Sequence, residues 1–181
     1  MTVLVQGGAG AVGQYAIQLA ALSGARVIAT VSSTEKAAMA RAAGAQVTVD
    51  YKTEDVVAGV MDFTDGAGVD RIVEVDFGTN FKIDAAVLKQ RGAIAAYSSS
   101  RAPQFEFDYY ALGYKGARLT FVQVYMLNEA ERAAAVADLA RMMASGALRH
   151  DVLHRFPLGQ IAEAHELMES GSVLGNIVVD I

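Results

Sequence analysis

Cysteine and tryptophan are absent from this 181-residue sequence, and only two prolines occur in it. Without cysteine, the chain forms no disulfide bond and offers no cysteine ligand to a metal ion. Its apolar runs are too short to span a bilayer, and no charged segment followed by an apolar one stands at its start. We therefore expect a soluble protein of the cytoplasm that has no membrane partner.

Clustered charge of one sign is lacking as well. The formal net charge is −5, and acidic and basic residues are scattered along the chain without a basic stripe. This pattern argues against nucleic acid as a main partner. Hydrophobic residues make up 53% of the sequence, which is enough to bury a large core in one domain of ordinary size or one domain with an appendage.

Glycine, by contrast, is plentiful near the start of the chain. The stretch from Thr2 to Ala20 reads TVLVQGGAGAVGQYAIQLA, in which a short apolar run is followed by Gly8, Gly10 and Gly13. The apolar run suits a buried parallel strand. Apolar residues then recur at helical spacing, at positions 12, 15, 16, 19 and 20. The predicted order is therefore strand, tight turn and helix.

The spacing G-x-G-x-x-G between a strand and a helix is the dinucleotide-binding fingerprint. Glycines without Cβ atoms let backbone N–H groups at a helix N-terminus approach a pyrophosphate, and the helix dipole favours its negative charge. The alternative is a turn whose glycines serve only the close packing of helix on strand. Because the strand begins at residue 2 or 3, we expect either a free-standing nucleotide-binding domain or a part of a larger protein.

The end of the second predicted strand, 26–31, bears on which dinucleotide binds. NAD-binding domains usually place Asp or Glu here, about 20 residues beyond the glycines, to bind the ribose hydroxyls. This chain has Ser32 and Ser33 instead, and Lys36 lies one turn into the next helix. A cation in the first turn opposes the helix dipole unless an anion such as a 2′-phosphate lies nearby. We therefore predict NADP rather than NAD. The alternatives are a capping box of Ser32 with Glu35 and a solvated surface lysine.

Strand and helix patterns alternate along the first two thirds of the chain. Helices are predicted over 35–43, 55–63 and 81–88, and strands over 46–50, 69–75, 92–97 and 118–125. This alternation predicts an α/β fold, a Rossmann-type doubly wound parallel sheet of about six strands. Ligands of such sheets bind at the carboxyl ends of the strands, which places on one rim Gly10, Ser32, Phe77, Tyr97 and Ser98.

The end of the chain departs from this alternation. A long helix is predicted over 129–145, followed by a helix over about 159–169 and a strand over 176–181. We therefore divide the chain into a dinucleotide-binding domain, residues 1–148, and a C-terminal strand-helix-strand appendage, residues 149–181.

The sequence contains no convincing catalytic set. His150 and His154 have i, i+4 spacing, but the residues between them form no metalloprotease motif, and we predict no metal site. Neither a G-x-S-x-G elbow nor the Tyr-x-x-x-Lys pair of short-chain dehydrogenases occurs. Hydride transfer needs a second wall for the substrate and a group that handles a proton, so the residues indicate a cofactor-binding part of an enzyme. A methyltransferase is disfavoured because an acid is missing after the second strand.

Four stretches carry a resemblance to a known family. They are QGGAGAVGQYAIQLA at 6–20, ARVIATVSSTEKAAMARAAGA at 25–45, VDYKTEDV at 49–56 and RFPLGQIAEAHELMESGSVLGNIVVDI at 155–181. Together they resemble the C-terminal portion of a medium-chain dehydrogenase/reductase of the zinc-free NADPH:quinone oxidoreductase (zeta-crystallin-like) branch. The last stretch is particularly specific, because nothing in a generic dinucleotide fold requires it.

The resemblance implies NADPH as the cofactor and assigns contacts to it. Ala11 and Val12, between the fingerprint glycines, would present backbone N–H groups to the pyrophosphate. The residues implied around the adenosine 2′-phosphate are Ser32, Ser33, Lys36 and Tyr51. Those implied along the cleft, beside the nicotinamide and on the tail are Phe77, Tyr97, Ser98, Phe121, Val122 and Gly175.

One position departs from the family pattern. Where relatives often carry Asp, a small residue and Val-Gly, this chain has Val75-Asp76-Phe77-Gly78. We expect the larger Phe77 to alter packing on the adenine side of the cofactor.

The resemblance also implies an activity and an assembly. NADPH would deliver hydride to a small-molecule electron acceptor, a quinone or an activated carbonyl or alkene. A GroES-like catalytic domain would precede the glycine strand and hold the ligands of any zinc, and the edge strand over 118–125 would pair across a two-fold to form a homodimer. An alternative of another class is a non-catalytic NADP-binding or sensor module that regulates a partner.

Overall fold

Six parallel strands form the centre of the molecule. The computed structural model describes residues 1–171 and 173–181. Its strands lie in the order β3-β2-β1-β4-β5-β6, and each is parallel to its neighbours. They are β1 (Thr2–Val5), β2 (Arg26–Val31), β3 (Val47–Asp50), β4 (Val69–Glu74), β5 (Leu88–Ala96) and β6 (Arg118–Phe121). The predicted doubly wound sheet of about six strands is confirmed.

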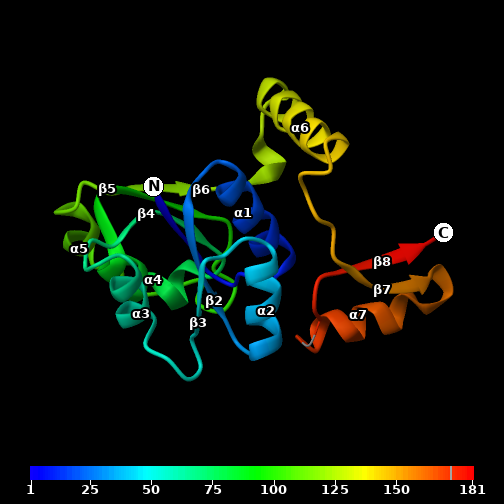
Figure 1. Ribbon diagram of the computed structural model, residues 1–181, viewed down its shortest axis with the longest axis horizontal. Coiled ribbons are helices and arrows are strands. Elements are labelled where there is room, and N and C mark those ends of the chain that lie inside the picture. Colours follow the sequence, from blue (N-terminus) through cyan, green and yellow to red (C-terminus); the bar gives the residue numbers. More distant parts are fainter. Residues whose placement is uncertain (172) are drawn as a thin grey trace.

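Helices cover both faces of this sheet (Figure 1). On one face lie α1 (Ala11–Leu22) and α2 (Thr34–Ala42), and on the other α3 (Val56–Phe63), α4 (Phe77–Val87) and the short α5 (Tyr109–Gly113). Side chains alternate along a strand, so Val3 and Val5 of β1 pack against α1 while Leu4 joins the opposite cluster. Two separate hydrophobic cores result, one on each face.

The order of the strands creates a switch point between β1 and β4. The chain runs outward from β1 through β2 to β3, then crosses to β4 and continues outward on the other side. Loops that follow β1 and β4 therefore leave the sheet in opposite directions and open a crevice at their carboxyl ends. Every residue of the predicted rim lies beyond the carboxyl end of a strand: Gly10 follows β1, Ser32 follows β2, Phe77 follows β4, and Tyr97 and Ser98 follow β5.

The buried face of α1 differs from the predicted one. Ile17 is buried as expected for a core residue, but it is flanked by the buried glutamines Gln14 and Gln18. Val12, expected on the apolar face, is 52% exposed. The glutamines are accommodated because their amides bind backbone groups: Gln14 donates to the Ala9 carbonyl, and Gln18 pairs with residue 149.

Three further boundaries differ from the sequence-based expectation, and one of them is the start of β5, which lies at Leu88 instead of 92. The fourth helix begins at Phe77 instead of 81, because Asp76 leaves the strand direction and the chain turns at once. The strand expected over 118–125 ends at Phe121, because its neighbour β5 ends at Ala96 and offers no further residues to pair with. A 3₁₀ turn, Val124–Met126, follows.

The remaining elements project from the sheet domain. The helix α6 (Glu129–Ala144) begins with a capping box between Asn128 and Glu131 and has no buried residue. After it, β7 (Val152–Pro157), α7 (Ile161–Glu169) and β8 (Asn176–Asp180) form a separate unit in which the two strands pair in parallel (Figure 1). The predicted strand-helix-strand appendage is confirmed, and we call it the tail. Within the described residues, no helix combines the length and apolar character needed to cross a membrane.

Candidate functional site

The glycine turn after β1 is built by close packing. Gly7 adopts a φ of +68°, and its N–H donates to the hydroxyl of Thr30 on β2 at 3.0 Å. A Cβ at Gly8 would lie 2.6 Å from the Cβ of Ala29, and one at Gly13 only 2.2 Å from the Gly7 carbonyl oxygen. Glycine is therefore required at positions 8 and 13 by contacts within the protein itself.

Gly10 differs from these two glycines. It is exposed at the N-terminus of α1, and a Cβ there would meet only the Gly7 oxygen at an ordinary 3.4 Å. As the residue before α1 it provides no side chain to accept the first N–H groups of the helix. Those donors remain directed outward, where the helix dipole favours an anion. Ala11 and Val12 lie in this first turn, and both are exposed.

A first cavity of about 510 Å³ opens beside this turn. Of the predicted site residues its wall includes Gly10, Ala11, Ser32, Lys36, Tyr51 and Gly175. The tail supplies one whole side of it, through Met168, Gly171, Val173, Asn176 and Ile177. Only Gly175 of this side was predicted, because no local pattern indicates which face of a distant unit turns toward the glycines.

Lys36 is the cation of the first cavity. Its Nζ donates to the hydroxyl of Ser32 at 3.2 Å and to the carbonyl of Gly171 in the tail at 3.4 Å. The cap of α2 is Ser33, whose hydroxyl accepts from the backbone N–H of Lys36. The alternative capping box of Ser32 with Glu35 is therefore wrong, and the Ser32 hydroxyl faces the cavity instead.

A second cavity of about 560 Å³ lies on the other side of the crevice, between the loops that follow β3 and β4. Tyr51 borders both cavities and is 46% exposed. Apolar walls come from α3, from α4 and from the loop after β4, and sequence reasoning missed them: Val56, Val57, Val75 and Ile83. Their signal was spread over three separate segments, none of which carries a motif.

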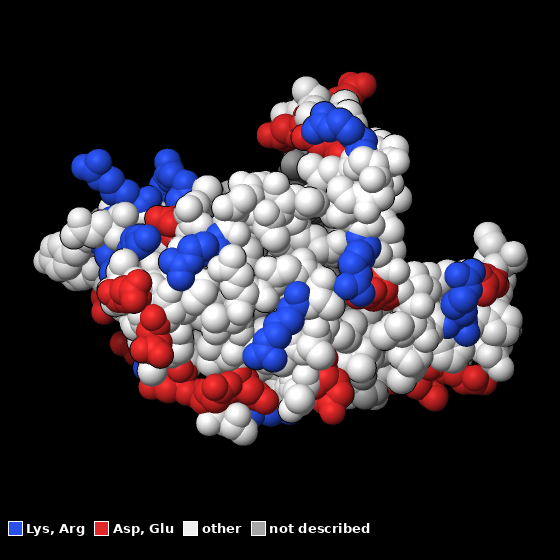
Figure 2. Space-filling view, viewed as in Figure 1, with Lys and Arg blue, Asp and Glu red and all other residues white. Residues whose placement is uncertain are grey.

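Charge distinguishes the first two cavities. The second is bordered by three acidic residues, Glu54, Asp55 and Asp76, and by one basic residue, Arg101. Figure 2 shows acidic side chains gathered along this edge of the molecule. The first contains Lys36 and, in its wall, no acidic residue among the described ones. Because like charges repel, a phosphate is favoured in the first cavity, while the second suits an uncharged ring.

A third cavity of about 360 Å³ lies beyond β5 and is aromatic. Its wall includes the predicted residues Phe77, Tyr97, Ser98 and Phe121. Phe77 is 3% exposed and meets the rings of Phe81, Phe105 and Phe121 edge-on. It therefore lies on this cavity and not beside Tyr51. Val122 stands outside the wall and continues the pairing of β6 by donating to the Ala96 carbonyl.

Burial and the charge of Glu74 raise the pKa of Tyr97 to about 12, so its phenol stays neutral.

Glu74 belongs to a buried carboxyl pair beneath the crevice. Asp84, fully buried, is hydrogen-bonded to Glu74 and accepts from the amide of Gln6 at 3.0 Å. Gln6 in turn accepts from Thr30, whose hydroxyl binds the glycine turn. Desolvation, with the charge of Glu74 adding to it, raises the pKa of Asp84 well above its usual value. A proton held by the pair lets both carboxyls stay buried without a cation.

The described residues hold no group of three or more His, Asp or Glu side chains that fits a metal ion. His150 bonds instead to the hydroxyl of Tyr15 at 2.8 Å. The described site thus combines a glycine turn at a helix N-terminus, the cations Lys36 and Arg101, and three cavities along the carboxyl edge of a parallel sheet.

Comparison with known proteins agrees with this geometry. The zinc-binding dehydrogenase family matches residues 11–145. A 2-haloacrylate reductase of a Burkholderia species is 31% identical over 98% of this chain and 54% of its own length, and a quinone oxidoreductase of Pseudomonas aeruginosa is 29% identical over 98% and 56%. The solved structure of Escherichia coli quinone oxidoreductase complexed with NADPH superposes with a TM-score of 0.87 at 27% identity, over 99% of this chain and 57% of that one.

The chain therefore spans about half the length of these relatives. The family match begins at Ala11, the first residue of α1, and covers the helices α1 to α6 and the strands β2 to β6. The resemblance drawn from the sequence is confirmed: this chain belongs to the zinc-binding dehydrogenase family, within the medium-chain dehydrogenase/reductase superfamily.

Proposed function

We propose that this chain is the NADPH-binding part of a quinone reductase-like oxidoreductase. The observation that carries the proposal is the position of Lys36, whose ammonium group lies between Ser32 and the tail on the wall of a cavity that adjoins the glycine turn. Solved relatives complexed with NADPH support it.

The cavities divide the cofactor between them in this proposal. The pyrophosphate lies at the turn containing Gly8, Gly10 and Gly13, against the N–H groups of Ala11 and Val12. The residues proposed for the 2′-phosphate are Ser32, Ser33, Lys36 and Tyr51. Adenine occupies the second cavity, whose apolar walls and exposed Tyr51 suit an uncharged aromatic ring.

The nicotinamide end lies at the third cavity, whose proposed contacts are Phe77, Tyr97, Ser98, Phe121 and Val122. Gly175, on the wall of the first cavity, touches the cofactor from the tail. When bound, NADPH supplies a hydride to a small electron acceptor, a quinone or an activated carbonyl or alkene. The chain's own part is to bind and orient the cofactor and to keep water from an aromatic wall. We assign catalysis proper to a part of the protein outside this chain.

The domain organisation, the oligomeric state and the cellular location are also part of the proposal. Residues 1–148 form the dinucleotide-binding domain, and residues 149–181 pack on a GroES-like domain of the whole protein. The open edge of β6, with the exposed Phe121, suits pairing with a second copy in a homodimer. The protein works in the cytoplasm.

Substitution of Lys36 tests the proposal. Lys36→Ala removes a charged hydrogen bond to the 2′-phosphate, worth about 1.5–3 kcal/mol, so NADPH affinity falls roughly ten- to more than a hundredfold while NADH affinity is unchanged. Lys52→Ala, at an exposed lysine outside the three cavity walls, is the matched control. Fluorescence titration of both cofactors provides the measurement. Equal weakening of NADPH and NADH by Lys36→Ala would refute the role of Lys36.

A further inference from the structure

The tail is joined to the sheet domain by a short segment that binds α1 through one buried glutamine. Gln18 is 6% exposed. Its Oε1 accepts from the backbone N–H of Arg149 at 2.7 Å, and its Nε2 donates to the backbone carbonyl of the same residue at 3.2 Å. A glutamine side chain carries an NH2 donor group beside a carbonyl acceptor. It can therefore bind both the N–H and the C=O of Arg149, as a paired backbone segment does.

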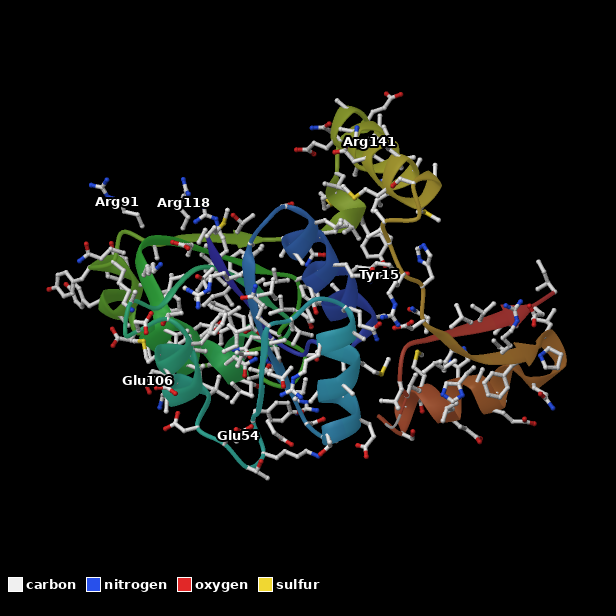
Figure 3. The ribbon with its side chains drawn as sticks, in the orientation of Figure 1. Tyr15, Glu54, Arg91, Glu106, Arg118 and Arg141 are labelled. Atoms are coloured by element: carbon white, nitrogen blue, oxygen red, sulfur yellow. The ribbon has the colours of Figure 1, made fainter. Side chains whose placement is uncertain are left out.

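Other contacts of the same segment reinforce this link. The guanidinium of Arg149 donates to the carbonyl of Ala42 at the end of α2 and to the carboxylate of Asp151. Figure 3 shows Tyr15 pointing from α1 toward the segment between α6 and β7, where its hydroxyl bonds to His150. We call residues 148–151 the clasp; Leu148, at its start, is buried.

The clasp also reaches the cofactor cavity. The carbonyl of Asp151 accepts from the backbone N–H of Asn176 at 2.7 Å. Gly175 packs against this carbonyl so closely that a Cβ would lie 2.3 Å from the Asp151 oxygen. Gly175, Asn176 and Ile177 form part of the wall of the first cavity. A continuous chain of contacts thus runs from α1 through the clasp to the tail side of the site.

Few apolar contacts hold the tail in place. Among its described residues the only buried hydrophobic one is Ala164, which lies on α7. Apart from the clasp, the described bonds between the tail and the first two helices reduce to the Lys36–Gly171 contact, at 3.4 Å and exposed to solvent. The distance between the tail wall and the glycine turn therefore depends on the clasp.

We propose that Gln18 is a positioning residue for cofactor binding, which keeps the 173–177 wall over the glycine turn by holding Arg149. This inference rests on the proposed function, because it takes the first cavity as the place of the cofactor. Gln18 itself lies outside the cavity wall. It acts through Arg149 and Asp151.

Replacement of Gln18 by the similarly shaped Met provides the test. Gln18→Met removes both hydrogen bonds while keeping the volume of the side chain, so we expect the affinity for NADPH to fall about tenfold. We also expect faster hydrogen exchange of the Asn176 amide, because its bond to the Asp151 carbonyl joins the clasp to the tail wall and opens more often when the clasp is loosened. Ser23→Ala is the matched control: it removes a side-chain bond to the Leu19 carbonyl on the same helix and touches no tail residue.

The two readouts separate the possible failures. Unchanged exchange of the Asn176 amide would overturn the clasp, and faster exchange with unchanged NADPH affinity would overturn the positioning role. A wild-type protein that binds no NADPH would contradict the proposed function and, with it, the positioning role, while exchange still reports on the clasp. If Gln18→Met does not fold, Arg149→Ala tests the clasp at another point: it keeps the backbone groups that Gln18 binds, removes the guanidinium bonds to Ala42 and Asp151, and must give both effects at a smaller size.

Discussion

Buried apolar side chains are distributed very unequally between the sheet domain, residues 1–121, and the rest of the chain. The sheet domain contains two core clusters, one on each face of the sheet. In the described part of 122–181, the buried hydrophobic residues are Leu148 and Ala164. Val136, Leu139 and Met143 of α6 are all more than 40% exposed. The first region is thus held by burial and the second mainly by polar contacts.

This difference has a consequence for the site. Apolar burial contributes about 25 cal/mol per Å² and stabilises the strands that carry the glycine turn. The tail side of the first cavity has little such support and depends on directed hydrogen bonds, chiefly those of Gln18 and Arg149. We infer that the site combines a rigid half, the carboxyl edge of the sheet, with a half whose position a single side chain can change.

The largest effect is expected from a substitution in the glycine turn, which belongs to the rigid half of the site. Gly13→Ala places a Cβ 2.2 Å from the Gly7 oxygen, and backbone on both sides prevents relaxation. We expect a loss of about 3 kcal/mol in the free energy of unfolding, although alanine normally favours a helix. Gly10→Ala has room for its Cβ and should lower the free energy of unfolding by less than about 1 kcal/mol. It should still abolish NADPH binding, because the added methyl group lies where the pyrophosphate approaches the turn. Urea unfolding and cofactor titration check the pair; similar stability losses at both positions would contradict this account.

A matched pair of helix substitutions tests the comparison itself. Val60 on α3 is fully buried, whereas Val136 on α6 is 60% exposed. We expect Val60→Ala to lower the free energy of unfolding by about 2 kcal/mol. Val136→Ala should change it by less than about 0.5 kcal/mol. Urea unfolding of both variants gives the answer, and an equal cost at the two sites would mean that α6 is covered in solution.

The buried carboxyl pair predicts a pH dependence confined to the sheet domain. The pKa of Asp84 is raised in the folded protein, so the native state keeps a proton that the unfolded chain releases above pH about 4. Stability from this group is complete below the unfolded pKa and falls as pH rises toward the folded one, by at most about 1.4 kcal/mol per pH unit.

The substitution Asp84→Asn should remove this pH-dependent contribution to the free energy of unfolding. Its amide retains an acceptor for Gln6 and gains a permanent donor toward Glu74. We expect the stability of the variant, relative to the wild type, to increase with pH between pH 5 and 8. Urea unfolding across this range measures the difference, which must be the same at every pH if the pair holds no proton.

The smallest effect is expected in the tail. Arg155 and Asp180 form an exposed ion pair between β7 and β8. Solvent and salt screen such pairs, so Arg155→Ala should leave the urea midpoint of the sheet domain unchanged. A shifted midpoint would show that the two regions unfold as one unit. Measurement in low and high salt provides the control, because a true ion-pair effect must shrink with added salt.

How much of each region can be predicted from the sequence depends on the same difference between apolar burial and polar contacts. The limits of β2 were predicted correctly because five buried apolar or small residues in a row leave little choice. The glycine spacing correctly indicated the turn. The buried face of α1 was not predicted, because Gln14 and Gln18 are polar and their backbone partners are visible only after folding.

Features made by distant segments lay beyond sequence reasoning. The second cavity joins residues of the β3–α3 loop with residues of α4 and of the loop after β4. The tail wall brings Met168, Gly171 and residues of 173–177 to the glycine turn. Neither carries a periodic or spaced motif. The position of Phe77 on the third cavity likewise depends on the aromatic residues Phe105 and Phe121, which approach it from other loops.

The most direct measurement is a side-by-side fluorescence titration of the wild-type chain with NADPH and NADH. The account predicts tighter binding of NADPH by roughly tenfold or more, because only NADPH carries the phosphate that Lys36 and Ser32 are placed to bind. Equal affinity for the two cofactors would contradict it.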